Sequence, residues 1–326
     1  MNERHLPVEA AAAPPPPTTP LFYGLRDYQK NSLGFLEHLV DRYGDVVKWR
    51  MPITIHIVNH PDDVKRVLSA PSERFSKQTI DYRILSGSLG KGLVTNDGAS
   101  WARQRRLMQP MFHNRAINPF DGPINAHTAD MLERWAALPP GHRLALEQEM
   151  STLTFKVVGT TLFGVDVEPY TQEIAEILEV INISTHELRA LLTLVPWLPT
   201  PHNRRAHDAV RRLDRSVYGL IDARRRSGER RDDILDRLLA ARDEEDGTGM
   251  DEKQIRDEVV TLLLAGHETS ANALLWTFEQ LASHPEVKAR LLAELTTELK
   301  GAPATSADLA RLPYLKQVVQ ETLRVR

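Results

Sequence analysis

The segment Ala265-Gly-His-Glu-Thr-Ser270 lies inside a long apolar stretch that predicts one helix from about Asp251 to Ser283. At helical spacing, one face of this stretch carries mostly small side chains: Leu262, Ala265, Gly266, Thr269 and Ala273. Such a face lets a flat molecule approach the backbone closely. The Thr269 hydroxyl can also donate to the Ala265 carbonyl and bend the helix. A seam where another helix packs tightly is the alternative interpretation.

The dipeptide His267-Glu268 begins the zinc-protease pattern H-E-x-x-H, which needs a second histidine four residues after the first. That position is Ala271, so the pattern is incomplete. We therefore do not predict a zinc protease.

Trp101 and Arg105 are four residues apart near the start of a second predicted helix, so their side chains share a face. An indole N–H beside a guanidinium makes a two-donor clamp for a carboxylate. An intrahelical cation–π pair on the surface is the alternative.

Glu321 and Arg324 lie on the polar side of the last predicted helix, opposite a cluster of apolar residues. By itself, this arrangement indicates a solvated ion pair three residues apart, worth a few tenths of a kcal/mol.

The elements that must position these residues are mainly helices. Two short β-branched segments, 45–51 and 53–58, predict a small sheet near the N-terminus. Residues 76–98 are rich in glycine and serine and predict a long loop. Residues 1–20 contain alanine and proline runs and predict a disordered tail before a domain at 21–326. The fold class is therefore mainly α with a small β-sheet.

Composition excludes several classes of protein. The 326 residues are 41% hydrophobic and carry a net charge of −3, which argues for a globular protein and against a nucleic-acid binder. The absence of cysteine excludes disulfides, cysteine-ligated zinc and a cysteine nucleophile. Since no long apolar run or signal-peptide pattern is present, we expect a cytoplasmic protein without a membrane anchor. The basic segment 224–231 and the acidic segment 243–246 predict solvated surfaces.

In this order and spacing, the three motifs resemble those of the cytochrome P-450 haem-thiolate monooxygenases. The resemblance covers residues from about 21 to 326. Segment 265–270 resembles the family's oxygen-activating helix motif, Trp101 with Arg105 its haem-propionate clamp, and Glu321 with Arg324 its glutamate–arginine structural pair.

The resemblance implies haem b (iron protoporphyrin IX) as cofactor and O2-dependent hydroxylation of a small apolar organic substrate. It implies catalytic roles for Thr269 in oxygen activation and for Glu268 in proton relay, and haem contacts from Ala265, Gly266 and Thr269. A ferredoxin- or flavodoxin-type donor or a reductase would supply electrons. By the same resemblance, residues 78–94 and 188–194 would border the substrate, although their apolar side chains could equally belong to the core.

The family holds its haem iron through a cysteine in a loop that follows the glutamate–arginine helix, and this sequence contains no cysteine. The resemblance therefore implies an incomplete cytochrome P-450 fold, truncated at the C-terminus before that loop. We expect the chain as given to be inactive, with no metal ligand of its own. The alternative function is a non-catalytic relic or a helical binding scaffold without haem.

Overall fold

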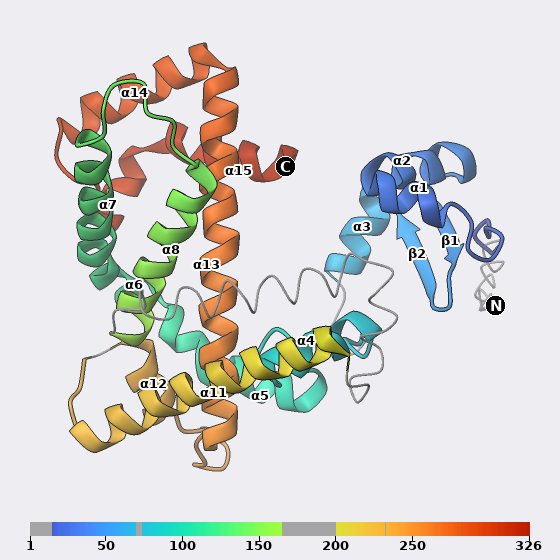
Figure 1. Cartoon of the computed structure of the whole chain (residues 1–326), viewed down its shortest axis with the longest axis horizontal. Coiled ribbons are helices and arrows are strands. Elements are labelled where there is room, and N and C mark those ends of the chain that lie inside the picture. The colour runs from blue at the N-terminus through green and yellow to red at the C-terminus, as the bar shows by residue number, and fades with distance from the viewer. Residues whose placement is uncertain (1–14, 70–73, 165–199, 232) are drawn as a thin grey trace, which may run out of the picture. The chain divides into compact units, whose positions relative to one another are not determined.

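The computed structural model describes residues 15–69, 74–164, 200–231 and 233–326 (Figure 1). The chain divides into two compact units between Ser76 and Lys77.

The first unit contains a two-stranded antiparallel sheet and short helices. The elements are α1 (Leu25–Lys30), α2 (Ser32–Tyr43), β1 (Val46–Arg50), β2 (Thr54–Val58) and α3 (Pro61–Leu68). The strands pair in the register Val46 to Val58 and Arg50 to Thr54. Phe35, Leu39 and Trp49 form the buried centre of this unit. The small sheet predicted from the β-branched segments is confirmed.

Part of the segment predicted as an N-terminal tail pairs with β1, while the boundary between tail and domain at residue 21 stays a prediction. Thr18 forms a parallel bridge with Lys48 of β1, and the Thr19 amide donates to the Lys48 carbonyl over 3.0 Å. Thr19 is also buried. The exposed edge of β1 offers backbone donors and acceptors that this extended segment satisfies, even though its composition does not predict a strand.

The described residues of the second unit form helices and the segments that connect them, with no strand among them. Its elements are α4 (Ile80–Leu89), α5 (Gly98–Met108), η2 (Gln109–Phe112), α6 (Asn114–Ile117), η3 (Asn118–Phe120), α7 (Asp121–Ala136), α8 (Leu146–Phe163), α11 (Pro201–Ser227), α12 (Ile234–Ala240), α13 (Glu252–Ser283), α14 (Pro285–Leu299), η5 (Ser306–Arg311) and α15 (Pro313–Val325). The mainly α fold class with one small sheet is therefore confirmed.

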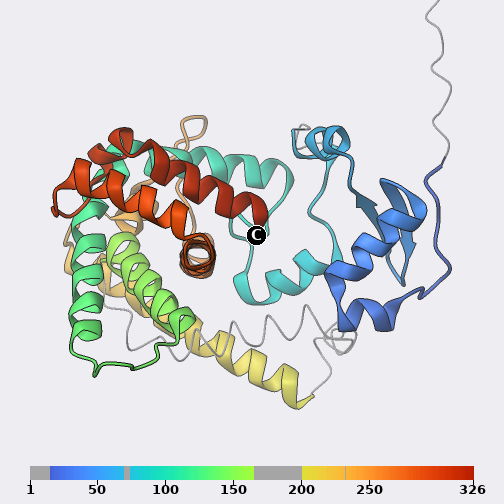
Figure 2. The ribbon, with the colours of Figure 1, turned by 90° about the horizontal axis from the view of Figure 1, so that it is seen from above.

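Helix α13 is the central element of this unit and runs unbroken, as predicted. Asp251 caps it by accepting from the Gln254 amide over 2.7 Å, and Pro285 begins the next helix. Seen end-on in Figure 2, α13 has α8 on one side with α7 beyond it, in agreement with the contacts α13–α8 and α7–α8. A helix flanked in this way has a different environment on each face.

The predicted loop 76–98 contains helix α4, so this part of the expectation is wrong. Ser86 lies inside this helix, and its hydroxyl donates to the Tyr82 carbonyl over 2.6 Å. Gly90, at φ +72°, ends the helix. Leu85 and Leu89 pack into the main core, which supplies the tertiary contacts that stabilise a segment of weak helix propensity.

The charged segments are also less solvated than predicted. Arg224 is buried and donates to Asp233 at 2.9 and 2.8 Å and to the Phe163 carbonyl at 2.9 Å. Asp243 is buried and paired with Arg103 and Arg106. Buried charges are tolerated here because each has several partners of opposite charge or polarity.

Candidate functional site

Trp101 and Arg105 lie on the same side of α5, as their spacing predicts. Asp97 caps this helix by accepting from the Gly98 amide. The Arg105 guanidinium carbon is 5.4 Å from the centre of the Trp101 ring, and the Lys77 ammonium is 5.3 Å from the same ring. The cation–π contact is therefore present.

The two donors of this pair are otherwise free among the described residues. Neither the indole N–H of Trp101 nor the guanidinium of Arg105 donates a hydrogen bond or forms an ion pair there. Arg105 is exposed and Trp101 is half-buried. The cation–π contact leaves the N–H groups available, so it is compatible with the carboxylate clamp, which stays a prediction.

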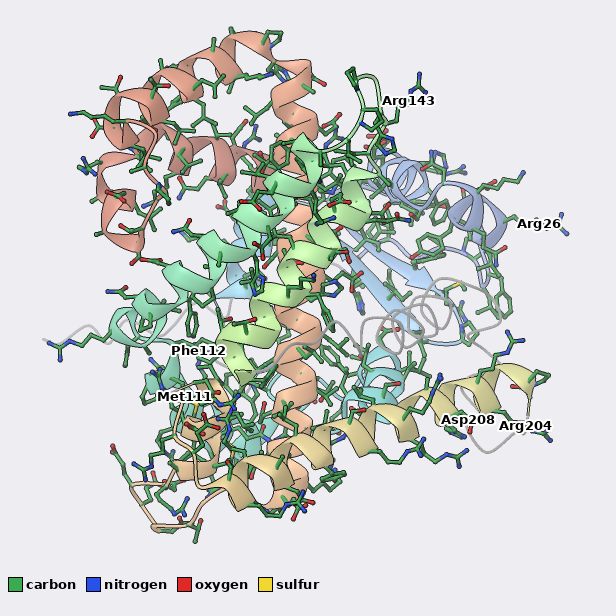
Figure 3. All side chains as sticks on the ribbon, turned by 60° about the vertical axis from the view of Figure 1, so that its left-hand side comes forward. Arg26, Met111, Phe112, Arg143, Arg204 and Asp208 are labelled. Carbon is green, nitrogen blue, oxygen red and sulfur yellow. The ribbon has the colours of Figure 1, made fainter. Side chains whose placement is uncertain are left out.

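A cavity of about 890 Å³ lies beside the pair in the second unit. Trp101 and Arg105 line it together with residues of η2, α6, α12 and the segment 241–244. Met111 of η2, labelled in Figure 3, is buried in its wall, while the neighbouring Phe112 is exposed. Arginines dominate the charged lining: Arg105, Arg106, Arg115, Arg237 and Arg242. Asp243 and Glu244 are the acidic residues of the lining, so arginines outnumber acids and the cavity favours an anionic group.

The other arginines of α5 differ from Arg105 because they have acidic partners. Arg106 donates to both oxygens of Asp243 at 3.1 and 3.0 Å, and this hydrogen bonding raises the pKa of the Arg106 guanidinium. Arg103 binds the same carboxylate over 2.9 Å and also donates to Thr248. Arg105 is therefore the arginine of α5 that is left to meet an external anion.

The small-residue face of α13 separates into two environments. A Cβ atom at Gly266 would lie 3.1 Å from the Val158 side chain of α8, so this glycine faces a neighbouring helix. Ala265 and Thr269 are exposed instead, and the Thr269 hydroxyl donates to the Ala265 carbonyl over 2.5 Å. The close helix seam explains Gly266, whereas Ala265, Thr269 and the neighbouring Glu268 are exposed and stay candidate ligand contacts.

His267, between these residues, belongs to the contact with α8. Its Nε2 lies 2.8 Å from the Ser151 hydroxyl, and its carbonyl accepts from Thr154 over 3.0 Å. Burial lowers the pKa of this imidazole. His267 therefore binds α13 to α8 and is not presented to a ligand.

The clamp and the α13 face belong to the same unit, and α5 lies beside the N-terminal half of α13 (Figure 1). The cavity at Trp101 takes its remaining lining from other elements and includes none of residues 265–269. That one ligand contacts both groups stays a prediction.

Glu321 and Arg324 form an ion pair on α15, with their side chains exposed and 2.6 Å between Arg324 Nη2 and Glu321 Oε1. Their mutual hydrogen bond lowers the pKa of Glu321 and raises the pKa of Arg324.

Sequence reasoning missed the polar groups that connect α13 to the segment before α5. Asp257 and Glu258 are buried and accept from the Lys91 and Leu93 amides at 2.8 and 2.9 Å. The available signal was an acidic pair inside an apolar helix combined with glycines at positions 90 and 92.

The residues 188–194, predicted to border the substrate, lie outside the described residues. Within the other predicted segment, 78–94, Leu85 and Leu89 belong to the core.

Comparison with known proteins adds sequence relatives to this geometry. The family model for Cytochrome P450 matches residues 13–326, beginning within the segment predicted as a tail. The chain is 34% identical over 299 residues to cyclooctat-9-en-7-ol 5-monooxygenase of Streptomyces melanosporofaciens, covering 91% of this chain and 64% of that protein. It is 33% identical over 309 residues to pentalenene oxygenase of Streptomyces avermitilis, covering 91% and 65%.

A mammalian relative extends the comparison. Cytochrome P450 4F4 of Rattus norvegicus is 32% identical over 302 residues, covering 85% of this chain and 58% of that protein. The chain thus spans somewhat less than two thirds of the length of these relatives. Among the described residues, no helix is both long and apolar enough to cross a membrane. Through the family match and these relatives, the chain belongs to the cytochrome P450 family.

Proposed function

We propose that this chain is part of a haem- and O2-dependent monooxygenase of an apolar organic substrate, and that without a cysteine ligand it does not complete the reaction by itself. The observation that carries the proposal is the pair of unpartnered donors, Trp101 and Arg105, at the edge of a cavity rich in arginine. Family membership supports the reaction type, and the donor pair supports the cofactor.

The chemistry of the donor pair fits haem. A haem propionate is a carboxylate, and a guanidinium with a neighbouring indole N–H supplies two donors to such an acceptor. The exposed Ala265 side chain is a methyl group, so a flat ring can approach α13 at this position. Trp101 and Arg105 would hold the propionate, and Ala265, Gly266 and Thr269 would border the ring. Since a close helix seam explains Gly266, its contribution would come through its backbone.

Haem iron, when bound, supplies the oxygen activation of the reaction. This chain's residues would supply the proton path beside it. The exposed Glu268 carboxylate can exchange protons with water, and the Thr269 hydroxyl can donate toward a reacting oxygen by leaving its bond to the Ala265 carbonyl. None of the 326 residues is a cysteine, so we propose no iron ligand from this chain.

The remaining parts of the proposal concern substrate, electron donor and location. The relatives named for cyclooctat-9-en-7-ol and pentalenene support an apolar organic substrate. Electrons would come from a ferredoxin- or flavodoxin-type donor or a reductase, in the cytoplasm. Arg103 and Arg106 do not favour a docking surface for an acidic donor, because Asp243 already pairs with both.

Haem titration of the purified chain tests the proposal. Arg105→Gln removes one charge-assisted hydrogen bond, so we expect the affinity for haem to fall about tenfold. Trp101→Phe should weaken binding by a smaller factor because it removes a neutral donor. The matched control is Arg106→Gln, which changes a cavity arginine that already has acidic partners.

Two outcomes would contradict the proposal. If wild type does not bind haem, the scaffold without haem becomes the better function. If Arg105→Gln and Arg106→Gln lower the affinity equally, binding follows the general charge of the cavity, and the two-donor clamp is wrong.

A further inference from the structure

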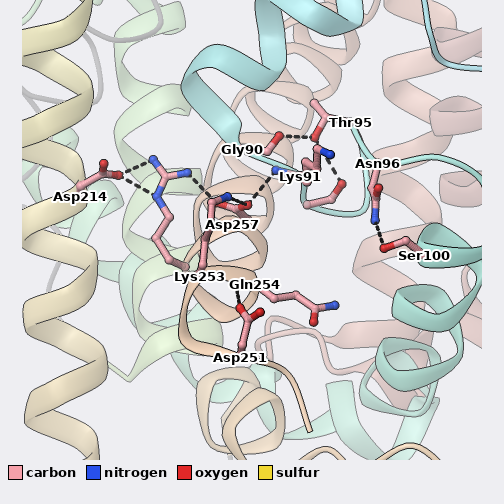
Figure 4. Close-up of polar contacts among 12 residues, drawn as sticks. Gly90, Lys91, Thr95, Asn96, Ser100, Asp214, Asp251, Lys253, Gln254 and Asp257 are labelled. Atoms are coloured by element: carbon pink, nitrogen blue, oxygen red, sulfur yellow. Dashed lines mark hydrogen bonds and ion pairs between the residues drawn. The ribbon is translucent and has the colours of Figure 1, made fainter. Parts of the chain in front are cut away.

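Two consecutive acidic residues of α13 hold the segment between α4 and α5. The Lys91 amide donates to Asp257 Oδ2 over 2.8 Å, a contact drawn in Figure 4, and the Leu93 amide donates to Glu258 Oε2 over 2.9 Å. Asp257 is 2% exposed and Glu258 is 0% exposed. Burying a carboxyl group costs free energy, so the retention of two such groups in α13 calls for a specific role.

The segment can reach these acids because it carries glycines. A Cβ atom at Gly90 would overlap the Asp257 carboxylate, and φ at Gly90 is +72°. A Cβ atom at Gly92 would overlap the Thr261 hydroxyl and lie 2.6 Å from the Asp257 carbonyl oxygen. The backbone of this segment therefore lies directly on α13, and its position depends on the two carboxyl groups.

The same segment is bonded on its other side to the residues around the clamp. The Gln104 side chain donates to the Lys91 carbonyl over 2.8 Å. The Lys77 ammonium donates to the Leu93 and Val94 carbonyls at 3.1 and 3.0 Å and lies over the Trp101 ring. Lys91 and Leu93 thus bind α13 through their amides, and they bind α5 and Lys77 through their carbonyls.

Asn96 and Asp97 complete the connection to α5. The Asn96 side chain donates to Gln104 Oε1 over 2.7 Å and to the Ser100 hydroxyl over 2.9 Å, the latter drawn in Figure 4. Asp97 caps α5 and also accepts from the Lys77 amide over 2.9 Å. If the segment between α4 and α5 shifts relative to α13, these hydrogen bonds would therefore move the first turns of α5.

We propose that Glu258, together with Asp257, is a positioning residue that sets where α5 presents Trp101 and Arg105. The role of Trp101 and Arg105 as a haem clamp rests on the proposed function. The hydrogen-bonded connection from α13 to α5 does not depend on it. Neither acid contacts the cavity in which Trp101 and Arg105 lie.

The two acids differ in charge balance, which gives Glu258 a separate role. Lys253 and Arg256 each donate to Asp257 over 2.9 Å, so its charge is neutralised. Among the described residues, Glu258 has no cationic partner, and its Oε1 and the Thr261 hydroxyl have no hydrogen-bond partner. Burial raises the pKa of Glu258 to about 7, with a further contribution from Asp257 and an opposing one from the Leu93 amide.

Burial fixes the sign of the titration of Glu258, and the neighbouring carboxylate of Asp257 acts in the same direction. The charged groups bonded to or around Asp257 include Lys253 and Arg256 of α13, Asp214 of α11 and Lys91 of the segment before α5. An opened segment would expose Glu258 to water and return its pKa toward 4.5. Since the closed state then binds the proton more tightly, loss of that proton favours opening.

Hydrogen exchange of the full 326-residue chain tests the positioning role. We expect the protection of the Leu93 amide, corrected for its intrinsic rate, to fall about tenfold or more between pH 5.5 and pH 8 in wild type. Glu258→Gln keeps an acceptor for this amide without a titratable proton, so its protection should not vary with pH. Glu258→Ala should lose protection at Leu93 and also at residues 101–105 of α5.

Two controls separate positioning from general destabilisation. Glu279→Gln changes a partly exposed acid of the same helix, so the protection of the Leu93 amide should keep its wild-type pH dependence. Leu291→Ala removes a buried side chain on α14, so it should raise hydrogen exchange without a particular effect at Leu93 or α5. The proposal is wrong if Glu258→Gln keeps the wild-type pH dependence, or if Glu258→Ala frees Leu93 while residues 101–105 stay protected.

Haem titration of the same variants keeps this inference distinct from the proposed function. If Glu258→Ala loosens α5 but Arg105→Gln leaves haem affinity unchanged, the clamp fails and the positioning role stands. If Arg105→Gln weakens haem binding but Glu258→Ala leaves α5 exchange unchanged, the clamp stands and the positioning role fails.

Discussion

The two halves of α13 have different surroundings although they belong to one unbroken helix. Residues 255–261 are buried on every side, including the charged residues Arg256, Asp257 and Glu258. From Ala265 onward, one face packs against α8 through Gly266 while Ala265, Glu268 and Thr269 are exposed. The first half thus uses its polar groups to hold neighbouring segments, whereas the second half buries His267 against α8 and exposes Glu268 and Thr269.

The largest effect on stability is expected in the buried half. Glu258→Ala removes the acceptor of the Leu93 amide and leaves a cavity, so we expect the free energy of unfolding to fall by about 3 kcal/mol. Urea unfolding at pH 6 measures this change. The matched control on the second half is Glu279→Ala, which should change stability little because its ion pair with Arg326 is exposed. Equal effects of the two variants would remove the contrast between the halves.

The same carboxyl predicts a pH dependence of stability. Its pKa is about 7 in the folded chain and about 4.5 when unfolded, so the folded state binds more protons between these values. Stability should therefore fall as pH rises from about 4.5 to about 7, by a few kcal/mol in total, because each pKa unit corresponds to about 1.4 kcal/mol. Urea midpoints across this range should show the fall in wild type. Glu258→Gln should lack this component, and an unchanged slope would contradict the assignment.

An intermediate effect is expected where the two halves meet. Gly266→Ala gains about 1 kcal/mol in helix propensity but crowds Val158 at 3.1 Å, and overpacking costs about 1–3 kcal/mol. We expect a net loss of about 1 kcal/mol. Val158→Ala in the same chain should relieve the crowding, so a double-mutant cycle should give a favourable coupling energy. Additive effects of the two substitutions would mean that Gly266 does not face a tight seam.

The smallest effect on stability is expected in the exposed half. Thr269→Ala removes an exposed hydroxyl that bonds to its own helix, so unfolding should change by no more than about 0.5 kcal/mol. Haem affinity should also survive. In a chain completed with a haem-ligating cysteine segment, product formed per reductant consumed should fall while hydrogen peroxide rises, because the proposed donor to the reacting oxygen is lost. An unchanged ratio would leave Thr269 with a packing role only.

Local signals in the sequence were sufficient for α13 and the two strands, but not for helix α4 or for the faces of α13. Asp251 and Pro285 bound α13 by capping and by backbone restriction, and alternating β-branched residues predict the two strands. The glycine and serine pattern at 76–98 was misleading because Leu85 and Leu89 of α4 are held by distant core residues. Periodicity also could not separate Gly266, which faces α8, from Ala265, which is exposed.

The sequence by itself determined the family motifs, the helical fold class and the pairing of Trp101 with Arg105, since these depend on residue type and on spacing within a helix. Only the tertiary structure decided which charges have partners. Arg103 and Arg106 meet Asp243, and Glu258 meets the Leu93 amide, across more than 130 residues of sequence. Burial and charge balance depend on such distant contacts, which local periodicity does not encode, and they determine which polar groups hold the fold and which are free to bind.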